Sequence, residues 1–172
     1  MVITNAKLSY AHVWEPQSIN GSEPKYSVSL VISKNDKKLL AEINAEIEKA
    51  MVAGINTKFQ GKRPATAKMP LRDGDIERPD DPIYQNCYFL NANSKNPPRI
   101  VDRKVKPIFD QDEIYSGCIA NVSVSFFAFN SNGNKGIAAG LGNIQKVRDG
   151  DRLGGGTTPE MDFKPLEDDF LD

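Results

Sequence analysis

Positively charged side chains gather in two short stretches of this chain, and binding of phosphate groups is the chemistry that such clusters favour. Residues 95–106 carry five cations interrupted only by Asp102, and Tyr84, Tyr88 and Phe89 precede them. Residues 58–72 carry five more cations on a stretch that also contains proline. Single-stranded nucleic acid is held by cations that follow its phosphates and by aromatic rings that stack on its bases. For each cluster alone, an ordinary solvated surface is an equal alternative.

A strand-like segment at residues 118–130 adds two further rings. One of its faces is apolar, whereas the other places Phe127 and Phe129 beside Asn121 and two serines. Rings this large are costly to expose on a solvent-facing sheet, and stacking on bases is one use for them. Cover by the helix, by the long loop or by a second subunit is the alternative. Our candidate nucleic-acid contacts are therefore Lys62, Arg63, Lys68, Tyr88, Lys95, Arg99, Arg103, Lys104, Lys106, Phe127 and Phe129.

Catalytic chemistry is difficult to assemble from this sequence. His12 is the only histidine, and it lies in a strand-like run where a structural role is the more common one. No spacing of Cys and His suits zinc, and the motif Asp73-Gly74-Asp75 lacks the downstream glutamate of a calcium loop. Neither Gly-rich stretch, at residues 140–142 or 154–156, has the sequence of a dinucleotide or phosphate loop. We therefore predict a binding protein, not an enzyme, with no cofactor and no metal.

The charge of the chain is divided unevenly. Residues 149–172 contain eight carboxylates against two cations, a net charge of −6, whereas residues 1–148 contain 20 Lys and Arg against 15 Asp and Glu, a net charge of +5. Such asymmetry suggests a body that binds a polyanion and an acidic tail that competes with the polyanion for the body and recruits partners. A tail that only keeps the protein soluble is the alternative. The tail residues that we expect to engage a partner are Glu167, Asp168, Asp169 and Phe170.

Length and composition indicate one domain followed by a tail. A chain of 172 residues can bury a substantial core, and no apolar run approaches the roughly 18 residues that a membrane span needs. The first residues do not have the layout of a signal peptide. Cys87 and Cys118 lie far apart in apolar segments, which favours two buried thiols over a disulfide. We therefore expect a cytoplasmic protein without membrane contact.

Most of the remaining pattern is that of β-strands. Residues 25–33 alternate between apolar and polar side chains, apart from Val31. The pair Asn132-Gly133 predicts a tight hairpin, with residues 136–147 as its returning strand. Further strand-like segments, rich in β-branched and aromatic residues, occupy residues 2–14, 83–92, 99–105 and 118–130.

One segment has the helical period instead. Leu40, Ile43, Ile47 and Met51 recur at helical spacing, Asn35 or Asp36 can cap the start of the helix, and Gly54 can end it. Residues 55–82 predict a long inserted loop, of the kind that is either functional or disordered. Short strands bounded by Gly and Pro, together with one helix, indicate a mainly β protein with a five-stranded OB-fold barrel. We assign residues 1–148 to this nucleic-acid-binding domain and residues 149–172 to a Gly-rich linker and acidic tail.

Several short motifs also give the chain a resemblance to a known family. Their order and spacing resemble those of a family of bacteriophage single-stranded DNA-binding proteins, over nearly the whole chain. The motifs are Pro70-Leu71-Arg72-Asp73-Gly74-Asp75, Tyr88-Phe89-Leu90-Asn91-Ala92-Asn93-Ser94-Lys95, Pro98-Arg99-Ile100-Val101-Asp102, Tyr115-Ser116-Gly117, and Asn134-Lys135-Gly136-Ile137 leading to Leu141 and Ile144-Gln145.

The resemblance implies an OB fold, binding of single-stranded DNA without strong sequence preference, and a role in phage DNA replication, recombination or repair in the bacterial host. It also implies an acidic tail like those of T7-type phage and bacterial single-strand binders, through which we expect replication or recombination proteins to be recruited. Those tails tend to finish on phenylalanine, whereas here Phe170 is followed by Leu171 and Asp172. The alternatives are a virion-structural or protein-interaction β-domain and an OB-type binder of RNA or oligosaccharide. The sequence leaves open whether the protein forms a homodimer.

Overall fold

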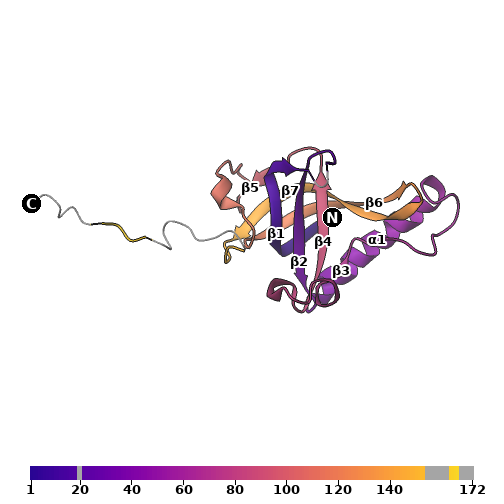
Figure 1. Ribbon diagram of the computed structural model, residues 1–172, viewed down its shortest axis with the longest axis horizontal. Helices are drawn as coiled ribbons and strands as arrows, with labels where there is room; N and C mark the ends of the chain where they lie inside the picture. Colours follow the sequence, from indigo (N-terminus) through magenta and orange to yellow (C-terminus); the bar gives the residue numbers. More distant parts are fainter. Residues whose placement is uncertain (19–20, 154–162, 167–172) are drawn as a thin grey trace, which may run out of the picture.

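Five long strands form a closed barrel in the computed structural model, which describes residues 1–18, 21–153 and 163–166 (Figure 1). The strands pair in the order β4-β2-β1-β6-β7, and a parallel pairing of β4 with β7 closes the barrel. Two short strands, β3 (Arg72–Asp73) and β5 (Ile100–Val101), extend the sheet beside β4 and β7. The barrel strands are β1 (Val2–Gln17), β2 (Lys25–Ser33), β4 (Cys87–Ser94), β6 (Ile119–Ser131) and β7 (Asn134–Arg148).

The inner faces of these strands supply the core. Leu8, Leu30, Leu90, Val122 and Ile144 come one from each barrel strand, and all five are fully buried. Burial of side chains of this size is the main favourable term in folding. The predicted class, a mainly β OB-fold barrel with one main helix, is confirmed.

Helix α1 (Lys37–Thr57) packs on this core through the predicted stripe of apolar residues. The Asp36 side chain accepts a hydrogen bond from the Leu39 amide and so caps the start of the helix. The prediction that Gly54 ends the helix is wrong, because α1 continues to Thr57. Gly54 is instead a packing residue: a Cβ there would lie 2.5 Å from the Ala128 Cβ and 2.8 Å from the Phe59 ring. Only glycine allows β6 to approach the helix this closely.

The hairpin formed by β6 and β7 extends beyond the barrel alongside α1 (Figure 1). Its turn is the predicted Asn132-Gly133 pair, and both residues have positive φ angles, 52° and 87°. Two positive φ angles at the centre of a two-residue loop match the twist of a hairpin. The Asn130 amide donates a hydrogen bond to the Lys58 carbonyl, which joins the hairpin to the end of α1.

Residues 55–82, predicted as one long loop, are largely attached to the barrel. The first of them complete α1, and the main chain of Lys68 then pairs with β7 on both sides of Gly136. After β3 comes the short helix α2 (Gly74–Glu77). The Lys34 ammonium forms 2.7 Å ion pairs with Asp73 and Asp75, and these partners raise its pKa. The segment is therefore fixed against β7 near its middle, and near its end against β4 through β3 and against Lys34, which follows β2.

Two predicted strands are shorter than expected. The segment at residues 83–92 becomes β4 only at Cys87, because Asp81 caps a 3₁₀ turn at Pro82–Tyr84. The segment at residues 99–105 is reduced to β5, because the chain turns at Asp102.

Both cysteines are free thiols, with Cys118 buried and Cys87 half-buried. In the described part of the chain, no helix is long and apolar enough to cross a membrane.

Candidate nucleic-acid interface

A band of small and polar side chains crosses the outer surface of the barrel from strand to strand. Register places Ser29 of β2 opposite Asn91 of β4, and Ser27 opposite Asn93. Across the closure of the barrel, Asn93 lies opposite Gly140 of β7. Paired positions in neighbouring strands share a face of the sheet, so the band continues without interruption. We call this surface the outer belt; it consists of Tyr10, His12, Ser27, Ser29, Asn91, Asn93, Ser125, Phe127, Ala138 and Gly140. Ser29 is its one buried member, and its hydroxyl accepts a hydrogen bond from the Tyr84 hydroxyl at 3.3 Å.

Small residues keep the part of the belt on β6 and β7 flat. Gly140 lies opposite Ser125, and Ala138 lies opposite Phe127. A Cβ on Gly140 would lie 2.8 Å from the Ser125 hydroxyl, so this surface admits no larger side chain without a shift. Glycine within a strand often marks a place where a ligand or another backbone comes close.

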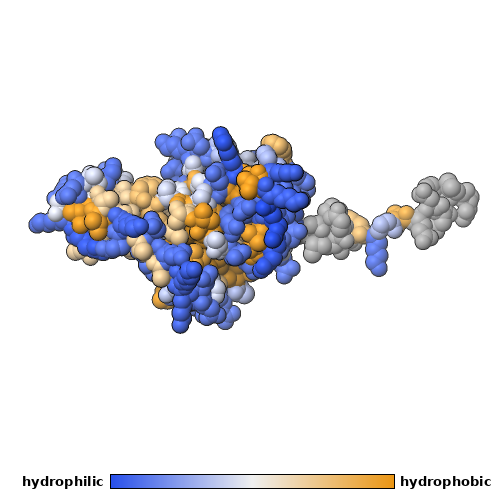
Figure 2. All heavy atoms as spheres, turned by 180° about the vertical axis from the view of Figure 1, so that it is seen from behind, coloured by the Kyte–Doolittle hydropathy of each residue, from blue (hydrophilic) through white to orange (hydrophobic). Residues whose placement is uncertain are grey.

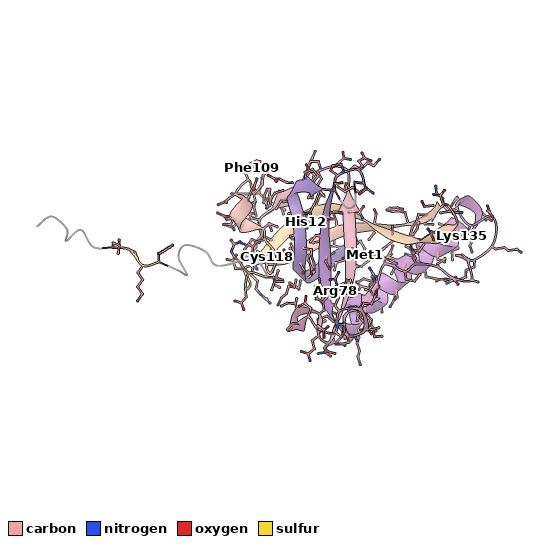
Figure 3. The ribbon with its side chains drawn as sticks, viewed as in Figure 1. Met1, His12, Arg78, Phe109, Cys118 and Lys135 are labelled. Atoms are coloured by element: carbon pink, nitrogen blue, oxygen red, sulfur yellow. The ribbon has the colours of Figure 1, made fainter. Side chains whose placement is uncertain are left out.

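Two shallow clefts meet in the middle of the belt, where both are lined by Asn91 and Asn93. The first, of about 390 Å³, reaches His12 and Arg78 on the side formed by β1, β2 and β4 (Figure 3). The second, of about 650 Å³, reaches Phe129 on β6. Strands lie about 4.8 Å apart, so a belt of five strands is roughly 20 Å across. On the face opposite to the one drawn in Figure 1, apolar side chains gather over the middle of the molecule among hydrophilic ones (Figure 2).

Tyr10 is placed at one end of the belt by an irregular backbone. The pairing of β1 with β2 shifts register between Ser9 and His12, and Tyr10 within this bulge has a φ of 47°. Its side chain is 54% exposed. A bulky residue in the left-handed region is uncommon, and a bulge redirects a side chain away from the regular pleat. The bulge therefore presents a tyrosine ring to solvent beside the polar belt.

Arg78 lies next to this ring and has no ion-pair partner among the described residues. Its guanidinium carbon is 5.2 Å from the ring centre of Tyr10, 5.0 Å from that of Tyr84 and 5.1 Å from that of Phe89. The Arg78 Nε is buried and makes no hydrogen bond within the described chain. A guanidinium held by rings and lacking a carboxylate can bind a phosphate oxygen.

The two phenylalanines that the sequence singled out lie at the opposite end, Phe127 within the belt and Phe129 two residues further along β6. Phe127 is 49% exposed, and Phe129 is half-buried in the second cleft. Lys68 and Arg72 line the same cleft. Arg72 is paired with Glu77 at 2.6 Å, whereas Lys68 is exposed and has no ion pair among the described residues. The structure thus places Lys68 and Phe129 in one cleft, with Phe127 two residues from Phe129 on the same face of β6.

Three other predicted cations form a separate group at the opposite end of the barrel. We call Arg103, Lys104 and Lys106 the cationic turn. The Asp102 carboxylate accepts hydrogen bonds from the amides of Lys106 and Lys104, which lower its pKa and hold the turn closed. The Arg103 guanidinium donates to the Val147 carbonyl at 2.8 Å.

The outer face of β6 connects the belt to the cationic turn. From Phe127 the outward positions continue through Ser125 and Ser123 to Asn121, a path of about 20 Å at the rise of a β-strand. The Asn121 amide donates to the Gln145 side chain at 3.0 Å, and both line a cleft with Arg103. Phosphates could therefore follow one continuous surface from the belt to the turn.

The remaining predicted contacts lie away from this surface or are already partnered. Tyr88 is on the core side of β4, with its ring partly buried and the Lys34 ammonium 5.1 Å away. It does not share a face with Phe127 and Phe129. Arg63 forms a two-pronged ion pair with Glu48 at 2.6 and 2.7 Å, which raises the pKa of Arg63 and lowers that of Glu48. Lys62, beside Arg63, is exposed.

Lys95 and Arg99 are exposed on the segment between β4 and β5, where Lys95 pairs with Glu23 at 3.3 Å. The predicted tail contacts Glu167, Asp168, Asp169 and Phe170 lie outside the described residues, as does the Gly-rich linker. The predicted start of the tail at Asp149 precedes the last contacts with the barrel. The Tyr115 hydroxyl bonds Asp149, and the Leu153 amide donates to the Ser116 carbonyl.

Reasoning from the sequence missed most of the belt, including Asn91, Asn93 and Tyr10, and it also missed Arg78 beside the belt. Asn91 and Asn93 alternate with Leu90 and Ala92 in a predicted strand, so their alternation could have identified them. Tyr10 carried no such signal, because its exposure depends on a bulge. Arg78 carried none either, because it reaches the belt from a loop through contacts with rings of distant segments.

Comparison with known proteins finds a family that matches nearly the whole chain. The family described as Enterobacter phage Enc34, ssDNA-binding protein, matches residues 1–171. A relative is named putative protein p50, from Acyrthosiphon pisum secondary endosymbiont phage 1. It is 33% identical in an alignment 172 residues long, which covers 95% of this chain and 92% of that protein.

Two solved structures share the fold. The single-stranded DNA-binding protein from bacteriophage Enc34, in complex with ssDNA, superposes with a TM-score of 0.80 at 24% identity and covers 89% of this chain and 88% of that one. The single-stranded DNA-binding protein gp2.5 of bacteriophage T7 superposes with a TM-score of 0.61 at 19% identity over 98% and 96% of the two chains. At these identities the likeness establishes the barrel architecture.

Proposed function

Because the chain belongs to the family of the ssDNA-binding protein of Enterobacter phage Enc34, we propose that it binds single-stranded DNA without strong sequence preference. Its role would be in phage DNA replication, recombination or repair, in the cytoplasm of the bacterial host. The observation that carries this proposal is the outer belt, a flat polar band with an exposed ring at each end. Exposed rings stack on any base, and the small side chains between the two rings let the DNA strand lie close to the sheet.

In this proposal the DNA strand follows the outer belt and then the outer face of β6. Bases stack on Tyr10, Phe127 and Phe129, and phosphates near the belt are bound by Arg78 and Lys68. Support for Arg78 comes from its unpaired guanidinium, and support for Lys68 comes from its position in the cleft of Phe129. Beyond Asn121, the phosphates reach the cationic turn. Flanking charges that can add to the path are Lys62, Arg63, Lys95 and Arg99.

The acidic tail is proposed to compete with DNA and to recruit partner proteins. A segment of net charge −6 tethered to a body of net charge +5 acts as a ligand at high effective concentration. When DNA occupies the cationic path the tail is released, so a replication or recombination protein would find it mainly on DNA-bound molecules.

Salt dependence tests the electrostatic part of this proposal. If about six phosphates are neutralised, the logarithm of the affinity for a dT oligomer should fall against the logarithm of salt concentration with a slope of about −4. Replacing Arg103 with alanine should reduce the magnitude of that slope by about 0.7, because one phosphate contact is lost. Lys49→Ala, an exposed change on α1, is the matched control and should leave the slope unchanged. A slope near zero in the parent protein would refute the cationic path.

A further inference from the structure

The only histidine of the chain lies in the first of the two belt clefts. His12 lines this cleft together with Arg78, Asn91 and Asn93, and its side chain is half-buried (Figure 3). A histidine that serves the fold alone usually satisfies its ring nitrogens within the protein, because buried polar groups are hydrogen-bonded. The His12 ring makes no hydrogen bond and no ion pair among the described residues. The fold therefore gives this ring no structural partner and leaves its nitrogens to water or to a ligand.

The backbone of β1 places this side chain on the belt. Val13, the next residue, is buried in the core, so the alternation of a strand directs His12 to the outer surface. His12 pairs with Ser27 of β2, and the register of the two strands shifts on both sides of this pair. Irregularities of this kind redirect side chains and are frequent next to functional sites. Two of them define the position of the one histidine.

No carboxylate of the described residues lines this cleft. From β1 it is lined by Tyr10, His12 and Gln17, and from β2 and β4 by serine, asparagine and small apolar side chains. The one permanent charge is the Arg78 guanidinium, which has no ion pair within the described chain. A phosphate oxygen accepts hydrogen bonds from a guanidinium and from an imidazole. Because no acid in this part of the chain neutralises the cleft, an anion that binds here must come from the ligand.

We propose that His12 and Arg78 together bind one phosphate of the DNA strand, and that the His12 imidazole takes up a proton from solvent when this phosphate binds. A neutral imidazole has one N–H, whereas the protonated ring has two and a positive charge. A phosphate at close range stabilises the charged ring, since an opposite charge favours the charged form. DNA and the proton therefore strengthen each other's binding by the same factor.

This inference rests on the proposed function and adds a dependence on pH that stacking and permanent charges do not give. Histidine changes charge between about pH 5 and pH 8, whereas carboxylates titrate near about pH 4 and lysines near about pH 10. Burial raises the pKa of both cysteine thiols, so they stay protonated in this range. A change in affinity within the range can therefore be assigned to one side chain by replacing it.

Fluorescence anisotropy of the full-length chain with a labelled dT oligomer, at about pH 5.5 and about pH 7, tests the inference. Uptake of one proton changes Kd by at most about tenfold per pH unit, and we expect the affinity to be about fivefold higher at the lower pH. The affinity gained at low pH should be lost again as the pH rises. The salt slope should also be steeper by about 0.7 at the lower pH, because one more phosphate is neutralised.

Two replacements of His12 separate its charge from its other contacts. His12→Gln keeps a hydrogen-bonding side chain that cannot become charged, so its affinity and salt slope should be equal at the two pH values. His12→Lys carries the charge at both pH values and should bind with the low-pH affinity of the parent at both. Unchanged thermal unfolding will show that the variants fold. Gln17→Ala is the matched control, because Gln17 lines the same cleft without titrating, and it should retain the pH dependence of the parent.

The acidic tail is identical in all these variants, so any pH dependence that comes from the tail will survive in His12→Gln. A pH dependence of the parent that persists undiminished in His12→Gln would overturn the proposal, and so would equal affinities of the parent at the two pH values. Neither result affects the proposed function, whose stacking and salt predictions are measured at a single pH. Absence of dT binding by the parent at both pH values would instead refute the proposed function itself.

Discussion

Replacing Tyr10 or Phe127 with alanine is expected to weaken binding of a dT oligomer by about 1–3 kcal/mol, roughly 5- to 150-fold in Kd, because each change removes one stacking surface. The two rings are at opposite ends of the outer belt, on β1 and β6, so the losses should add in the double variant. Both side chains are about half exposed, so truncation should cost little stability. Fluorescence anisotropy with a labelled oligomer measures the losses directly.

The salt dependence of the affinity distinguishes the loss of a stacking ring from the loss of a charge. A ring displaces no counterion, so the salt slope of both variants should match that of the parent protein. Val52→Ala, which truncates an exposed apolar side chain on α1 away from the belt, should bind like the parent. Unaltered affinity in both ring variants would exclude the belt as the site of base stacking.

Deleting residues 159–172 is expected to tighten binding of single-stranded DNA, most strongly at low salt. The deletion removes six of the eight carboxylates that give residues 149–172 their net charge of −6, so a tethered competitor is lost. Salt screens the competition between tail and DNA, so the difference between full-length and truncated protein should shrink as salt rises. Association should also become faster, because the field of the body is no longer partly neutralised.

A tail that only keeps the protein soluble gives a different result. Its removal would promote aggregation and leave the affinity unchanged at every salt concentration. Comparing full-length and truncated protein on one labelled dT oligomer at two salt concentrations distinguishes the mechanisms. Equal affinities at low salt are incompatible with competition, whatever the tail contributes to solubility.

The elements of this fold were predictable because their signals are local. Alternation in residues 25–33, the helical period of Leu40 to Met51 and the Asn132-Gly133 turn each lie within one segment. Gly54 was misread because glycine ends many helices, whereas here it is needed for contact with Ala128, a residue far away in sequence. Local patterns carry no information about such a neighbour.

The candidate site was only partly predictable, because it is defined by register across five strands. Phe127 and Phe129 were identified from alternation within β6, but the pairing of Ser29 with Asn91 and of Asn93 with Gly140 exists only in the closed barrel. Proximity along the chain was also misleading. Tyr88 precedes the basic cluster in sequence, yet its ring faces the core side of β4.

Binding of the unmodified chain to three labelled oligomers of equal length tests the central claim most directly. Titration of dT, double-stranded DNA and RNA should show salt-dependent binding to dT that is tighter than binding to the duplex, since stacking needs unpaired bases. A single strand of mixed sequence should bind with similar affinity, because the belt reads no base edges. Absence of salt-sensitive binding to any of these oligomers would contradict the account and favour a structural role for the domain.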